Sequence, residues 1–229
     1  MDRNLALNLA RVTEAAALSA GKWLGKGDKN AADGAAVDAM RRMFDTVDID
    51  GTVVIGEGEI DEAPMLYIGE KIGTRESDDQ VDIAVDPIDG TNSIANGTDN
   101  SIAVLAVAPK GCLLNAPDIY MDKIACGPKA KGAIKLDDSP SENVKRVAKA
   151  LNKNIDEITV AVLDRPRHEG IINEIISVGA RVKKISDGDI VTAIETCYED
   201  SGIDLVIGRG GAPEGVIAAA ALKLSLIHI

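Results

Sequence analysis

Apolar residues recur along this chain in two patterns, one typical of helices and one typical of strands. Apolar positions three or four residues apart predict helices, and short apolar runs between turn residues predict buried strands. The predicted helices are residues 3–24, 31–47, 143–151, 167–178, 189–197 and 214–224. The predicted strands are residues 52–55, 65–69, 81–86, 101–108, 119–126, 133–135, 159–163, 181–185 and 205–207. The regular alternation in the second half indicates βαβ units and an α/β fold.

A turn-rich stretch, residues 127–140, separates the two halves of this pattern. We therefore predict an N-terminal α+β half at residues 1–138 and an α/β C-terminal half at residues 139–229. The last residues, 224–229, are apolar and carry no stop signal, cap or polar tail. We expect either a fragment that ends inside its fold or a tail of non-native sequence.

Composition narrows the possible functions. The 229 residues are 45% hydrophobic but only 2% aromatic, so the core must consist of Val, Ile, Leu and Ala. A net charge of −12 argues against nucleic acid or an anionic membrane as a partner. Three widely spaced cysteines and two histidines make a disulfide framework, a zinc knuckle or Ser-His-Asp catalysis improbable. No signal peptide or membrane-spanning run is present, so we predict a cytoplasmic protein.

The stretch from Val81 to Asn92 carries the clearest chemical signal. An apolar run leads into Asp86, where the following Pro87 is expected to end the strand. The turn would bring Asp86 and Asp89 together, and two close carboxylates repel each other unless a cation lies between them. Mg²⁺ and Mn²⁺ favour such oxygen ligands, and the backbone N–H groups of the next residues suit a phosphate. Metal-assisted phosphoryl chemistry is therefore preferred over an acidic surface turn.

Two other acidic positions are ambiguous when they are considered alone. Asp33 lies in the first turn of its predicted helix, where it could simply complement the helix dipole. Residues 56–64 form a very acidic loop, which is usually solvated, but this one follows a strand at a glycine. In α/β folds, the residues that bind ligands commonly lie at the carboxyl ends of strands.

The motif Asp86-Pro87-Ile88-Asp89-Gly90-Thr91 resembles the signature of the lithium-sensitive sugar and inositol phosphatase superfamily. Five further stretches resemble, more narrowly, the class II (GlpX-type) fructose-1,6-bisphosphatases: residues 27–34, 54–70, 164–168, 186–189 and 210–215. The resemblance extends from residue 3 to about residue 223. Family members continue beyond that point, so the resemblance implies a layered α/β/α/β/α sandwich of the sugar phosphatase type that is C-terminally truncated.

The resemblance implies a function and a set of site residues. The implied reaction is hydrolysis of the 1-phosphate of fructose 1,6-bisphosphate to fructose 6-phosphate, in gluconeogenesis and glycerol metabolism, with Mn²⁺ or Mg²⁺ as cofactor. The implied metal ligands are Asp33, Glu57, Asp86, Asp89 and Glu214. The implied substrate contacts are Asp89, Gly90, Thr91, Tyr120, Arg165, Pro166, Arg167, Asp187, Gly188, Asp189 and Gly211. Lys29, Glu59, Asp61 and Thr91 are the expected catalytic residues.

Residue chemistry suggests roles for some of these side chains. Glu59 or Asp61 would position or deprotonate the attacking water, and Thr91 would contact a metal or relay a proton. Arg165 and Arg167 suit the distal 6-phosphate through their planar forks. Core packing is the competing interpretation for Tyr120. Helix N-capping is the simpler interpretation for Asp187 and Asp189, and binding of sugar hydroxyls is compatible with it.

Four functions remain open. The leading hypothesis is a fructose bisphosphatase that acts on a small-molecule sugar bisphosphate and forms a homo-oligomer, with no nucleic-acid or membrane partner. A second keeps the chemistry but changes the substrate to sedoheptulose 1,7-bisphosphate or an inositol phosphate. A third is an inactive, truncated paralogue that only binds metal or sugar phosphate. The fourth is an acidic α/β interaction domain.

Overall fold

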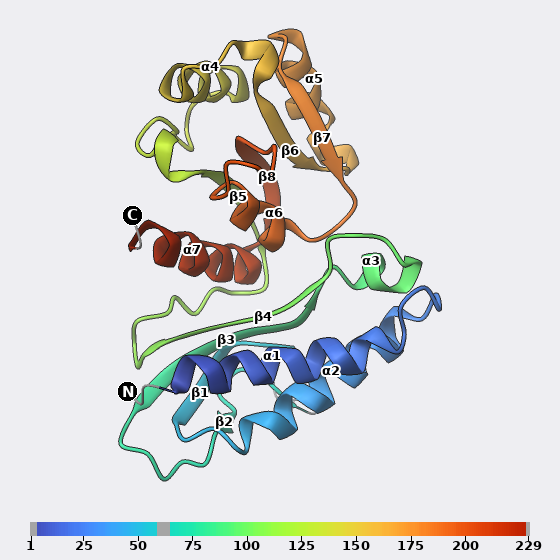
Figure 1. Cartoon of the computed structure of the whole chain (residues 1–229), viewed down its shortest axis with the longest axis vertical. Helices are drawn as coiled ribbons and strands as arrows, with labels where there is room; N and C mark the ends of the chain where they lie inside the picture. The colour runs from blue at the N-terminus through green and yellow to red at the C-terminus, as the bar shows by residue number, and fades with distance from the viewer. Residues whose placement is uncertain (1–3, 59–64, 228–229) are drawn as a thin grey trace. The chain divides into compact units, whose positions relative to one another are not determined.

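The computed structural model describes residues 4–58 and 65–227 (Figure 1). Its helices are α1 (Leu5–Gly21), α2 (Lys29–Phe44), α3 (Thr91–Asn96), α4 (Pro140–Leu151), α5 (Glu169–Ser177), α6 (Asp189–Glu195) and α7 (Ala212–Ile227). Its strands are β1 (Asp50–Ile55), β2 (Lys71–Ile72), β3 (Gln80–Asp89), β4 (Ile102–Pro109), β5 (Tyr120–Cys126), β6 (Thr159–Leu163), β7 (Arg181–Ile185) and β8 (Leu205–Gly211). Short 3₁₀ turns are η1 (Pro128–Ala130), η2 (Ile155–Glu157) and η3 (Pro166–His168). Mixed sheets with helices confirm the predicted α/β class.

The chain forms two compact units. Residues 1–119 and 212–217 make up the first, and residues 120–211 and 218–229 make up the second. The sequence pattern placed the division between residues 138 and 139. In the structure the chain first passes from one unit to the other between Ile119 and Tyr120, because Tyr120 already belongs to β5, which pairs with β8. That long-range pairing leaves no local signal in the sequence.

The first unit is a four-stranded sheet in the order β2-β1-β3-β4. β1 and β3 are parallel, whereas β2 and β4 are antiparallel to their neighbours. Apolar residues of α1 and α2, such as Val12, Met40 and Phe44, pack with strand residues such as Val53 and Ile83 in one core. The apolar stripes that predicted these two helices are therefore their buried faces.

The prediction that the third strand ends at Asp86 is wrong, because β3 continues to Asp89. Asp86 pairs with Val104 and Asp89 pairs with Ile102, so three steps on β3 oppose two steps on β4. This extra residue is a β-bulge. A bulge accommodates Pro87, which has no N–H for the strand ladder.

The predicted strand at residues 65–69 is also wrong. Leu66 has φ +56° and Gly69 has φ +92°, and neither is compatible with an extended strand. The segment instead turns back on itself, because the carboxylate of Glu70 accepts a hydrogen bond from the Leu66 N–H. The short strand β2 follows at Lys71.

The second unit is a four-stranded sheet in the order β5-β8-β6-β7. β6 is parallel to β7 and β8, and β5 is antiparallel to β8. Its separate core combines Val144 and Val147 of α4 and Ile175 of α5 with Val160 of β6 and Leu205 of β8. Each unit thus buries its own apolar cluster.

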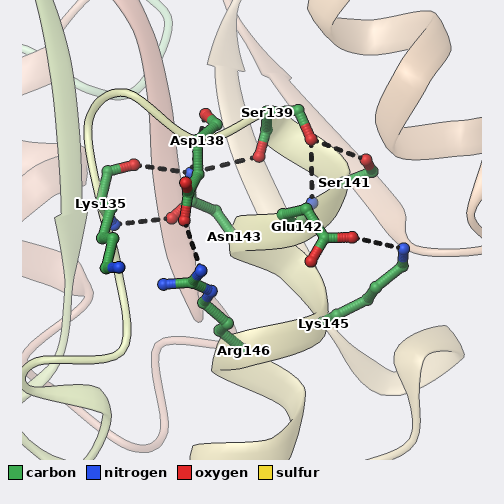
Figure 2. A network of polar contacts seen from close by, with 8 residues as sticks. All are labelled: Lys135, Asp138, Ser139, Ser141, Glu142, Asn143, Lys145 and Arg146. Atoms are coloured by element: carbon green, nitrogen blue, oxygen red, sulfur yellow. Dashed lines mark hydrogen bonds and ion pairs between the residues drawn. The ribbon is translucent and has the colours of Figure 1, made fainter.

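The predicted strand at residues 133–135 does not form, and Figure 2 shows what takes its place. The buried Asn143 side chain accepts a hydrogen bond from the Lys135 N–H at 2.8 Å and donates one to the Lys135 carbonyl at 2.9 Å. Its amide also contacts the carbonyls of Asp138 and Ser139 at 3.2 Å each. The Ser139 hydroxyl caps α4 through the Glu142 N–H. A side chain therefore satisfies the backbone that a strand partner would have satisfied.

Among the described residues, no helix combines the length and the apolar run that crossing a bilayer requires.

Candidate active site

Carboxylates from four distant elements line one pocket of the first unit. The pocket has a volume of about 310 Å³. Its acidic and hydroxyl lining residues are Asp33, Glu57, Asp86, Thr91, Asp118 and Glu214. Four of the five predicted metal ligands therefore meet at one place, although 181 residues separate the first of them from the last.

Local structure explains how each acid reaches the pocket. α2 begins at Lys29 because the Asp28 side chain accepts the Ala31 N–H at 2.9 Å, so Asp33 lies two residues further into the helix than predicted. Glu57 follows the end of β1, and Glu214 is the third residue of α7. Asp86 lies in β3 at the start of the bulge.

The protonation of these acids reflects burial and mutual repulsion. The pKa of Asp86 is raised well above its usual value, first by burial and then by the nearby charges of Asp89, Glu57, Glu214 and Asp33. Burial, with a contribution from Asp33, raises the pKa of Glu57 to about 7. Burial also raises the pKa of Asp33. Converging carboxylates of this kind are unfavourable unless protons or cations neutralise them.

The donor set fits a hard divalent cation, since every acidic oxygen around the pocket is of the type that Mg²⁺ and Mn²⁺ favour. Within residues 4–58 and 65–227, however, no three His, Cys, Asp or Glu side chains already lie in a metal-binding arrangement.

Gly90 is required where the bulge passes into α3. Its φ is +91°, and a β-carbon at this position would collide with the Asn100 carbonyl. The next residue, Thr91, starts α3 and lines the pocket. Asp89 is buried at 6% exposure and interacts electrostatically with Asp86, although it is outside the set of pocket-lining residues.

The remaining predicted catalytic residues are Lys29, Glu59 and Asp61. Lys29 is exposed as the first residue of α2 and is not among the pocket-lining residues. Glu59 and Asp61 lie outside the described residues.

In the second unit, several predicted substrate residues gather at the end of β8. The guanidinium of Arg167 lies 4.7 Å from the centre of the Tyr120 ring and donates two hydrogen bonds to the Arg209 carbonyl, at 3.1 and 2.9 Å. Tyr120 pairs with Gly211 across the β5–β8 ladder. Tyr120 is 61% exposed, so the core-packing interpretation is wrong.

The His168 ring connects two backbone segments next to Arg167 through hydrogen bonds. Its Nε2 accepts the Arg209 N–H at 2.9 Å, so its Nδ1 carries the proton and donates to the Leu163 carbonyl at 2.8 Å. The ring is 1% exposed. His168 thereby ties the η3 turn, which follows Arg165, to β8; the Arg165 side chain itself bonds the Asp164 carbonyl at 3.1 Å.

Asp189 also lies near the end of β8, next to Gly210. Gly188 is the N-cap of α6 with φ +76°, so N-capping by Asp189 is wrong. The Asp189 carboxylate instead accepts a hydrogen bond from Lys123 Nζ at 2.8 Å. Both side chains lie over Gly210, where a β-carbon would come within 2.8 Å of Asp189 Oδ2. Asp187 precedes this turn.

Comparison with known proteins decides the family. The family model of bacterial, glpX-encoded fructose-1,6-bisphosphatase matches residues 3–226. The chain belongs to this family. Fructose-1,6-bisphosphatase 1 class 2 of Escherichia coli K12 is 58% identical over 97% of this chain, and the class 2 protein of Haemophilus influenzae is 52% identical over the same share.

This member of the glpX-encoded fructose-1,6-bisphosphatase family spans 66% of the length of the Escherichia coli relative and 67% of the Haemophilus influenzae relative. Among solved structures, the extragenic suppressor from Pyrococcus furiosus matches with a TM-score of 0.41 and 15% identity, covering 96% of this chain and 82% of that one. A likeness this weak does not bear on the fold assignment.

Asp118 is a pocket residue of this glpX-type chain that was not predicted from the sequence. Asp118 lies in the segment before β5 and lines the pocket with Ala116. The one available signal was an acid next to Pro117 just before a predicted strand. That signal is weak, because its neighbours in space come from β1, β3 and α7.

Proposed function

We propose that this chain carries the active site of a class 2 fructose-1,6-bisphosphatase, which hydrolyses the 1-phosphate of fructose 1,6-bisphosphate to fructose 6-phosphate and phosphate. The observation that carries the proposal is the pocket in which Asp33, Glu57, Asp86 and Glu214 converge. Family membership supplies the substrate class. The chemistry requires such a cluster, because water is a poor nucleophile at neutral pH and the phosphate ester is negatively charged.

The cofactor in this proposal is Mn²⁺ or Mg²⁺. Asp33, Glu57, Asp86 and Glu214 would hold it, with Asp89 from the same bulge as a further ligand. When bound, the cation lowers the pKa of a water molecule and offsets charge on the phosphoryl oxygens. It would also stabilise the ionised forms of Asp86 and Glu57, whose pKa values are raised in its absence.

The side chains of the protein would orient the reaction. The Thr91 hydroxyl, at the pocket wall, would bond the reacting phosphate or relay a proton, with Gly90 allowing close backbone approach. Glu59 or Asp61 is our proposed general base, and Lys29 our proposed contact for phosphate charge. A general base is typically worth about 10²–10⁴-fold in rate.

We assign the sugar and its distal phosphate to the predicted residues of the second unit. Arg167 has five N–H donors, and two of them are directed at the Arg209 carbonyl. Stacking on Tyr120 then fixes the plane of the guanidinium. A guanidinium fixed in this way suits a phosphate, with Arg165 alongside, while Asp187, Gly188, Asp189 and Gly211 suit sugar hydroxyls.

Phosphate release by this chain with Mn²⁺ tests the assignment. Asp86→Asn should lower kcat at least 10³-fold, because the neutral amide removes the charge at the centre of the carboxylate cluster. Asp38→Asn is the matched control, since Asp38 is on α2 and pairs with Arg42 at 2.8 Å rather than lining the pocket. Circular dichroism should show that both variants fold. Undiminished phosphate release by Asp86→Asn would refute the assignment.

A comparison of kcat/KM values on different phosphate esters distinguishes the proposed substrate from the alternative substrates. We expect the highest kcat/KM on fructose 1,6-bisphosphate, a lower value on sedoheptulose 1,7-bisphosphate and the lowest on inositol 1-phosphate. Calorimetric binding of fructose 1,6-bisphosphate without phosphate release would instead favour a chain that binds and does not catalyse.

A further inference from the structure

Glu70 is a buried acid whose partners are all structural. It is 9% exposed, and it is not one of the pocket-lining residues. Its carboxylate accepts a hydrogen bond from Arg41 Nε at 2.6 Å through one oxygen and from the Leu66 N–H through the other. A buried carboxylate keeps such partners because leaving it unpaired is costly.

The Leu66 backbone connects the Arg41–Glu70 ion pair to Glu57 at the pocket. Its N–H is bound by Glu70, and its carbonyl accepts the Glu57 N–H at 3.0 Å. The contact is close, because a β-carbon on the preceding Gly56 would collide with the Leu66 carbonyl. The position of the Glu57 backbone is therefore set by Leu66.

Leu66 itself is in an unfavourable conformation. Its φ is +56°, which side chains other than glycine rarely adopt, and its side chain is fully buried. Such a conformation persists only where the surroundings hold it in place. Burial of the side chain and the hydrogen bond to Glu70 supply that restraint.

Arg41 anchors the other end of the connection on α2. This helix also carries Asp33, about two turns before Arg41. Arg41 is held in turn by Asp45, at 2.6 Å from its Nη1. α2 thus fixes Asp33 directly and Glu57 through Arg41, Glu70 and Leu66.

We propose that Arg41 and Glu70 are positioning residues: their ion pair holds the Leu66 turn, and through it keeps Glu57 at the pocket in place to bind a divalent cation. This inference rests on the proposed metal-dependent function. Partners beyond the first coordination shell orient ligands in this way, and their loss typically costs about 10–100-fold in metal affinity.

The test combines calorimetric Mn²⁺ binding with amide hydrogen exchange on the metal-free chain. Arg41→Met and Glu70→Gln should each weaken Mn²⁺ binding by about tenfold or more. In the same variants the Glu57 and Leu66 amides should exchange faster relative to the amides of β6. Arg41→Lys should be intermediate, because an ammonium restores the charge but not the fork.

Arg42→Met is the matched control. It removes the same charge from the next position of α2, where Arg42 pairs with the partly exposed Asp38 rather than with Glu70. Its Mn²⁺ affinity and its exchange at Glu57 should stay within twofold of the starting protein. If Glu70→Gln does not fold, Arg41→Met decides, since its side chain is partly exposed.

The outcomes separate this inference from the function beneath it. If the unaltered chain binds no Mn²⁺, the proposed metal-dependent function is wrong. Hydrogen exchange alone then tests whether Arg41 and Glu70 restrain the backbone at Leu66 and Glu57. Full protection of the Glu57 and Leu66 amides in both Arg41→Met and Glu70→Gln would overturn it. Unchanged Mn²⁺ affinity in both variants would overturn the positioning role even with a working enzyme.

Discussion

The partly buried Cys126 shows how the local environment controls the reactivity of a side chain in the second unit. Burial, with a contribution from Cys197, raises the pKa of the Cys126 thiol to about 11. The Cys126 sulfur also lies 3.5 Å from the Ala130 carbonyl, which suits a protonated thiol. None of the three cysteines, Cys112, Cys126 and Cys197, forms a disulfide, and Cys112 is exposed rather than buried. Their local environments, which composition does not encode, distinguish one from another.

We therefore expect Cys126 to alkylate more slowly than the exposed Cys112. Only the thiolate reacts, and with a pKa of about 11 roughly one Cys126 thiol in a thousand is ionised at pH 8. The rate at Cys126 should rise about tenfold per pH unit between pH 7.5 and 9.5. Mass spectrometry after timed iodoacetamide treatment measures it, and denatured protein provides the control. Equal native rates at the two cysteines would contradict the assigned burial.

Elements held by regular packing could be predicted from the sequence, and elements set by individual side chains could not. The predicted β6 and β7 match the structure residue for residue, because alternating strands and helices leave a clear hydrophobic pattern. The two false strands fail because Glu70 and Asn143 bind nearby backbone and hold it in turns. The bulge in β3 was missed because it depends on pairing with β4.

The turn at Gly90, which follows the bulge in β3, allows a prediction about the stability of the chain. Gly90→Ala should lower the free energy of unfolding by more than about 2 kcal/mol. The alanine would have to keep a positive φ, and its methyl group would also collide with the Asn100 carbonyl. Gly111→Ala separates the two effects. Gly111 has φ +81° with nothing within 4 Å of a β-carbon, so it should cost only about 1 kcal/mol. Urea unfolding gives both values, and equal losses would show that the contact at Gly90 is unimportant.

At the scale of the whole molecule, the candidate site depends on connections that no local pattern reveals. Asp33, Glu57, Asp86 and Glu214 come from α2, the end of β1, β3 and α7. Periodicity predicted most of these elements, but only the family resemblance predicted that their acids meet. Asp118 was missed for the same reason, because it lies in a segment without a motif. Cytoplasmic location and homo-oligomeric assembly stay predictions.

Metal binding should be visible in the stability of the entire chain. The carboxylate pocket forms only in the folded first unit, so a cation that binds there stabilises the folded state by mass action. At a free Mn²⁺ concentration of 100 times Kd, this stabilisation is about 2.7 kcal/mol, and Tm should rise accordingly. Asp86→Asn should lose most of the increase, whereas Asp38→Asn should keep it, since Asp38 pairs with Arg42 outside the pocket. Scanning calorimetry with and without Mn²⁺ measures the shift. A Tm that saturating Mn²⁺ leaves unchanged would mean that these carboxylates do not form a metal site, and the acidic interaction domain would then be the better interpretation.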